Sequence, residues 1–328
     1  MNACLRTLIF AIGGMALSSC IEFESEVIRY HHDASADELR MTLNYEGISG
    51  GVGYKGPADK EPGNPNKLSS RQVEQFESVI KGGRAFFFEN WLFEYDRSSI
   101  QEFLKTIRKG DVDHDDLVFV EPWKAFLQTV LDHVELTNLG FYLNENQRLS
   151  GTQTLVIKDF SNFLEITNEM IRRLVVNRID KELRKVESGE TDEEDGPSPE
   201  TVALITNACK KKHNFLQIKK GILVVRVPLG KWEYLKFRNG ILEKEPDPEE
   251  IISETLPLPI TGTKSFYEDK MLTLVLGDGK QGINILTKKC HSGYSPNALR
   301  YIRKNHPALL RDEAKITSTA KGFLTGGD

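Results

Sequence analysis

Apolar residues recur along this chain with two periods, and these periods predict paired strands with helices between the pairs. Alternation of apolar and polar residues, with turn formers nearby, predicts strand pairs over 22–30 and 39–45, 138–144 and 153–157, 215–218 and 222–228, and 271–276 and 283–287. Helical spacing predicts helices over 69–81, 98–109 and 161–186, from Pro122, from Ser198, and over 295–305. Because the strands are paired rather than alternating strictly with helices, the predicted fold class is α+β with antiparallel strand pairs and two subdomains.

Three further stretches are less regular. The aromatic-rich run 84–95 predicts a strand, and 231–238 is compatible with either a helix or a strand. The tail from Ala314 is polar and is expected to fray.

The first twenty residues differ from the rest of the chain. Arg6 precedes an uncharged apolar run over 8–17, which is much shorter than the ~20 residues that a membrane-spanning helix needs. Small residues then precede a cysteine in Leu17-Ser18-Ser19-Cys20, an order typical of a secretory signal peptide. These four residues resemble the lipobox of bacterial lipoproteins. The resemblance implies cleavage before Cys20 and acylation of its thiol.

By this resemblance the chain is held at a membrane through fatty acid on Cys20, and its body lies outside the cytoplasm. The three acyl chains usual in this class exceed the two signals that stable anchoring requires. Ile21, rather than an aspartate, follows the cysteine, which by the same resemblance favours the outer membrane. The alternative is an ordinary secretory signal, cut after Ala16 or Ser19, which leaves Cys20 as a plain thiol.

One acidic stretch, 188–199, combines glycine and proline with carboxylates and has no large apolar residue, which predicts a linker or an exposed loop. The sequence therefore divides into a cleaved signal peptide over 1–19, an α+β region over 20–187, this linker, a second α+β region over 200–305 and a polar tail over 306–328.

Composition narrows the class of partner. Apolar residues make up 39% and charged residues 28% of the chain, which is a globular composition. The net charge of −5 becomes −6 once Arg6 leaves with the signal peptide, and a mildly acidic protein is a poor partner for nucleic acid. Cys209 and Cys290 then remain in the body beside Cys20, and the sequence leaves open whether the two are joined by a disulfide.

Several short matches to cofactor and metal motifs lack the context that the chemistry requires. The glycine patterns at 51–56 and 277–282 are not followed by a helix that could hold a pyrophosphate. The acidic run 111–116 lacks the glycine and the glutamate of an EF-hand loop, although its carboxylates leave a looser calcium site open. His31 and His32 are adjacent on a strand and therefore point to opposite faces. No cofactor and no metal site is predicted.

The basic run Lys210-Lys211-Lys212-His213 has two interpretations. Cations at a helix C-terminus complement the helix dipole, which is the favoured explanation. Contact with anionic lipid headgroups or with an acidic partner is the other.

Gly47-Ile48-Ser49-Gly50-Gly51 matches the G-x-S-x-G motif of serine hydrolases. That motif needs a helix directly after the serine, but residues 52–66 are rich in glycine and proline. We therefore expect a loop residue at Ser49, no catalytic residue, and a body that binds or scaffolds a partner at the cell envelope. The alternative is an envelope hydrolase that uses Ser49 with a distant histidine such as His291.

Overall fold

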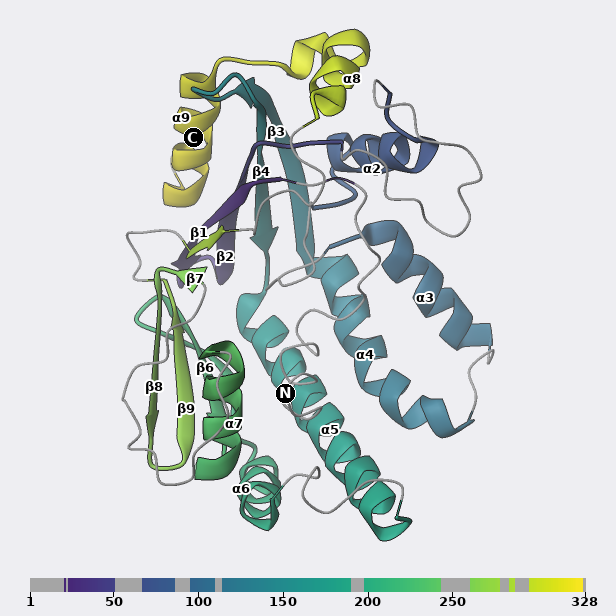
Figure 1. Ribbon diagram of the computed structural model, residues 1–328, viewed down its shortest axis with the longest axis vertical. Helices are drawn as coiled ribbons and strands as arrows, with labels where there is room; N and C mark the ends of the chain where they lie inside the picture. Colours follow the sequence, from purple (N-terminus) through teal and green to yellow (C-terminus); the bar gives the residue numbers. More distant parts are fainter. Residues whose placement is uncertain are drawn as a thin grey trace. The chain divides into compact units, whose positions relative to one another are not determined.

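The computed structural model of the chain describes residues 21, 23–50, 67–85, 95–109, 114–189, 198–242, 260–277, 283–286 and 295–326. These residues form two compact units, each with helices and antiparallel strands (Figure 1). Unit 1 contains 100–133 and 159–280, and unit 2 contains 15–99, 134–158 and 281–328. The α+β class predicted from the sequence is therefore confirmed.

Unit 2 is built on an antiparallel sheet in which the strand order is β3-β4-β2-β1-β10. Its strands are β1 (Ser25–Asp33), β2 (Glu38–Glu46), β3 (Val134–Leu143), β4 (Leu149–Ile157) and β10 (Ile283–Leu286). The β1–β2 hairpin and the β3–β4 pair were both predicted by the alternation of apolar residues. Leu39, Leu43 and Tyr45 on β2 are buried on one face, as this period of two requires.

The helices of unit 2 are α2 (Ser70–Ile80), α8 (Asn297–Asn305) and α9 (Glu313–Thr325), and a 3₁₀ turn, η2 (Pro307–Leu309), follows α8. A capping box at Ser69 starts α2, at the start of the helix predicted over 69–81. The expectation that the C-terminal tail frays was wrong, because the tail contains α9. Ile316 and Ala320 lie one helical turn apart on its buried side, and α9 packs on β1, β2, β3 and β4.

Unit 1 has a second antiparallel sheet of strand order β5-β6-β9-β8. Its strands are β5 (Leu216–Lys219), β6 (Ile222–Pro228), β8 (Thr263–Glu268) and β9 (Met271–Leu276), and the two-residue strand β7 (Ile260–Thr261) precedes β8. The helices are α3 (Arg97–Lys109), α4 (His114–His133), α5 (Phe160–Glu187), α6 (Pro199–Lys210) and α7 (Lys231–Leu242). Among the described residues, no helix is long and apolar enough to cross a membrane.

Two details of the sequence prediction were wrong. Pro122 lies inside α4 rather than in its first turn, since α4 begins at His114. The strands 271–276 and 283–287 do not form a hairpin. β9 pairs with β8 and β6, whereas β10 pairs with β1, because a tight turn at Asp269 and Lys270 joins β8 directly to β9.

The two units also divide the chain differently from the ranges expected from the sequence. The helices on either side of the acidic stretch 188–199, α5 and α6, belong to the same unit and pack together. The strands of unit 2 come from three separate parts of the chain, since nonlocal pairing rather than linker composition decides which segments fold together.

Candidate functional site

The proposed acylation site leads directly into the core of unit 2. Cys20 itself lies outside the described residues, but Ile21 and Phe23 have only 2% and 0% of their surface exposed. The Phe23 ring packs edge-on against Tyr45, with 5.0 Å between the ring centres. The Glu24 backbone N–H then donates to the Glu46 carbonyl at 2.8 Å. The chain is therefore buried within one residue of Cys20.

Ser49 lies beyond the end of β2, outside the named helices and strands, and its side chain is fully buried. The Ser295 backbone N–H donates to Ser49 Oγ at 2.8 Å, across 246 residues of sequence. The Gln72 side-chain amide donates to the backbone carbonyl of Gly50, which follows Ser49 in the chain. These bonds tie the end of β2 to α2 and to the start of α8. His291 and the segment after Gly50 lie outside the described residues.

Glu26 is a buried carboxyl outside the candidate residues considered from the sequence. Only 2% of its surface is exposed, and its Oε2 atom has no hydrogen-bond partner in the described part of the chain. It faces the core side of β1, opposite Tyr45 of β2. Burial raises the pKa of Glu26 to about 8, because the ionised form loses its hydration.

The Glu77 carboxylate on α2 makes hydrogen bonds with two side chains from the C-terminal part of unit 2. The Tyr301 hydroxyl donates to Glu77 Oε1 at 2.5 Å, and His306 Nε2 lies 2.6 Å from the same oxygen. The hydrogen bond from Tyr301 lowers the pKa of Glu77. Burial and the bond to the carboxylate raise the pKa of Tyr301 to about 12. The cluster joins α2 to α8 and fixes the direction in which the chain leaves α8.

In unit 1, Glu233 is buried at the junction of α6 and α7. It accepts hydrogen bonds from the Ser198 backbone N–H at 2.8 Å and from the Thr201 hydroxyl at 2.6 Å. Burial acts to raise the pKa of Glu233, but these hydrogen bonds outweigh burial, and the pKa is lowered. Thr201 Oγ1 also accepts from the Gly230 backbone N–H at 2.8 Å. Every partner is a capping or turn group, so the arrangement holds two helix starts together.

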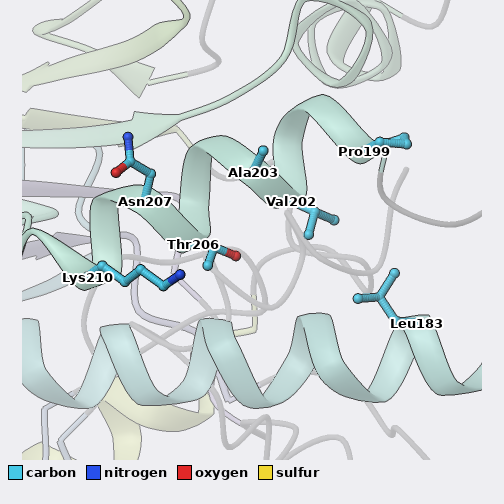
Figure 2. A pocket seen from close by; sticks show the side chains of 7 residues that line it. All are labelled: Leu183, Pro199, Val202, Ala203, Thr206, Asn207 and Lys210. Carbon is cyan, nitrogen blue, oxygen red and sulfur yellow. The ribbon is translucent and has the colours of Figure 1, made fainter.

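Unit 1 also has an open groove of about 570 Å³ along α6 (Figure 2). Leu183 projects toward this groove from α5, and the other lining residues belong to α6. They are Pro199, Val202, Ala203, Thr206, Asn207 and Lys210. One amide and one ammonium lie toward one end of an otherwise mainly apolar lining, and this pattern selects no particular ligand.

Those of the remaining residues considered from the sequence that the structure describes do not gather into one site. His31 and His32 are opposite Arg40 and Leu39 at the far end of the β1–β2 hairpin. In the described part of the chain, no group of three metal-ligating side chains occurs. Cys209 is a free thiol, and Cys290 lies outside the described residues.

The lysines of the basic run lie at and just beyond the C-terminal end of α6, where their charge complements the helix dipole. The side chains of the acidic run 111–116 lie outside the described part.

Comparison with known proteins adds no relative: no family model, no curated protein and no solved structure matches this chain.

Proposed function

We propose that this chain is a bacterial lipoprotein, anchored at the cell envelope by lipid on Cys20, whose α+β body binds or scaffolds a partner there. The observation that carries the proposal is the sequence Leu17-Ser18-Ser19-Cys20, placed directly after a charged and then an apolar stretch. The burial of Ile21 and Phe23 supports it, because cleavage before Cys20 would leave both of these core residues in the body.

The surroundings of Ser49 favour binding over hydrolysis. A catalytic serine must expose its oxygen to substrate beside a base and an oxyanion site. Ser49 instead is 0% exposed and accepts a hydrogen bond from the Ser295 backbone. A fluorophosphonate probe tests this choice. We expect the mature protein to stay unlabelled, whereas labelling that disappears in Ser49→Ala would establish the hydrolase.

The anchor is tested by growing cells that express the chain with an alkyne-tagged fatty acid. The parent protein should carry the tag, and Cys20→Ala should lose it and accumulate as unprocessed precursor, because lipid transfer precedes cleavage in lipoproteins. Cys209→Ala is the matched control and should keep the tag. Label retained in Cys20→Ala would overturn the proposal.

A further inference from the structure

Residues 297–311 of unit 2 form a basic segment. They contain four arginines and lysines and no aspartate or glutamate. Ala298, Leu299 and Ile302 bury one side of α8. The four cationic side chains are all on the exposed side of the segment: Arg300, Arg303, Lys304 and Arg311. The protein core thus covers the apolar side of α8, and its cationic side faces outward. Clusters of exposed Lys and Arg near a membrane are attracted to anionic lipid headgroups.

An apolar turn interrupts these cations. Pro307 and Ala308 in η2 are exposed, and Leu309 and Leu310 are half-buried. Cations beside a small exposed apolar tip suit the boundary between lipid headgroups and acyl chains. We call the exposed residues Arg300, Arg303, Lys304, Pro307, Ala308 and Arg311 the α8–η2 surface.

Backbone contacts fix the α8–η2 surface to one end of the sheet. Leu310 forms a parallel bridge with Phe141 near the end of β3, and the Arg311 backbone N–H donates to the Phe141 carbonyl at 2.8 Å. The approach is close enough that a Cβ on Gly140 would lie 2.8 Å from the Leu309 carbonyl oxygen. Figure 1 shows α8 beyond the end of the sheet at which β3 and β4 are joined.

The same end of the sheet is where the anchored chain enters it. One row of paired residues crosses the sheet from β3 through β4 and β2 to β1. Its members are Phe141, Gly151, Tyr45 and Glu26, and Glu26 is the second residue of β1. Neighbouring strands are about 4.8 Å apart, so this row spans about 14 Å from β3 to β1. Glu26 is six residues after Cys20, and an extended chain of that length reaches at most about 21 Å. An acyl anchor on Cys20 would therefore lie within about 21 Å of this row.

We propose that the α8–η2 surface binds the anionic headgroups of phospholipids in the membrane that holds the acyl anchor. This inference rests on the proposed function, because the anchor on Cys20 is what brings this end of the sheet to a membrane. The guanidinium and ammonium groups pair with lipid phosphates, and the apolar turn enters the headgroup layer. The body is thereby held in one orientation at the membrane.

The test uses the mature chain from residue 20 with Cys20→Ser, so that acylation does not contribute to binding. This mature chain contains every residue that the structure describes. Sedimentation with vesicles of pure phosphatidylcholine, and of phosphatidylcholine with 30% phosphatidylglycerol, should show binding to the anionic vesicles only. Each basic residue near an anionic surface contributes about 1 kcal/mol, so Arg303→Gln with Lys304→Gln should weaken binding about thirtyfold. Both side chains are exposed, and unchanged circular dichroism should confirm that this variant folds.

Lys210→Gln with Lys211→Gln is the matched control, since it removes two exposed lysines from unit 1. We expect this control to bind the anionic vesicles like the parent. Equal loss in both double variants, no loss in the α8 variant, or no preference of the parent for phosphatidylglycerol would overturn the inference. Failure of the fatty-acid labelling experiment would overturn the anchor instead, and this sedimentation result would stand independently of it.

Discussion

Replacement of Glu26 by glutamine should remove a specific pH dependence from the stability of unit 2. The pKa of Glu26 is about 8 in the folded chain against an ordinary value of 4.5. Between these two pH values the folded state therefore holds more protons than the unfolded state, and the free energy of unfolding falls as the pH rises. The contribution of the protonated carboxyl is fully present below about pH 4.5 and is lost as the pH rises through about 8.

The magnitude follows from the same shift. One pKa unit corresponds to about 1.4 kcal/mol, so the difference in stability between Glu26→Gln and the parent should grow by about 3 kcal/mol from pH 5 to pH 7. The increase favours the variant, because the glutamine amide does not ionise. The effect arises because the buried carboxyl has almost no access to water, with only 2% of its surface exposed.

Hydrogen exchange on peptides from β1 and β2 measures this effect in unit 2 directly. Comparison of the two proteins at each pH, from 5 to 8, cancels the intrinsic exchange rates. Glu145→Gln, on the exposed turn between β3 and β4, controls for the exchange of a carboxyl for an amide. A difference between parent and Glu26→Gln that stays constant across this pH range would show that the Glu26 pKa is not raised in the folded chain.

Three further substitutions test packing in unit 2, each by urea unfolding. Ser49→Ala should lower the free energy of unfolding by about 1–3 kcal/mol, because it leaves the buried Ser295 N–H without its acceptor. A loss below about 0.5 kcal/mol, which is usual for exposed residues, would show that this hydrogen bond does not stabilise the fold. Tyr301→Phe should cost about 1 kcal/mol at pH 7 and less at a pH below the lowered pKa of Glu77, where protonation of that carboxylate weakens the bond that the hydroxyl makes. A pH-independent loss would contradict this. Ile316→Ala should cost about 2–5 kcal/mol if α9 is part of the core, whereas a neutral result would restore the frayed tail.

Local patterns in the sequence predicted most of the individual elements. Ser69 and Ser198 are N-caps at the predicted starts of two helices, and the predicted helix over 161–186 is α5. Failures occurred where tertiary packing overrides a local rule. Pro122 is accommodated inside α4, and the short apolar stripe of Ile316 and Ala320 makes a helix because a sheet is available to cover it.

The arrangement of elements was harder to predict because it depends on contacts between distant residues. β10 joins a sheet whose first strand is more than 250 residues earlier, and no local signal marks that pairing. Glu77 contacts Tyr301 and His306, although both are more than 220 residues after it in the sequence. For Glu26 a signal did exist, since the register of the predicted β1–β2 hairpin could have placed this carboxyl beside Tyr45 on the apolar face.

The lipid anchor is tested most directly by the intact mass of the protein purified from cell membranes. We expect a chain that begins at Cys20 and carries the added mass of a diacylglycerol and an amide-linked fatty acid. A fragment spectrum should place that mass on the first residue. A chain that begins at another residue, or at Cys20 with an unmodified thiol, would show that the protein is not anchored by lipid on Cys20.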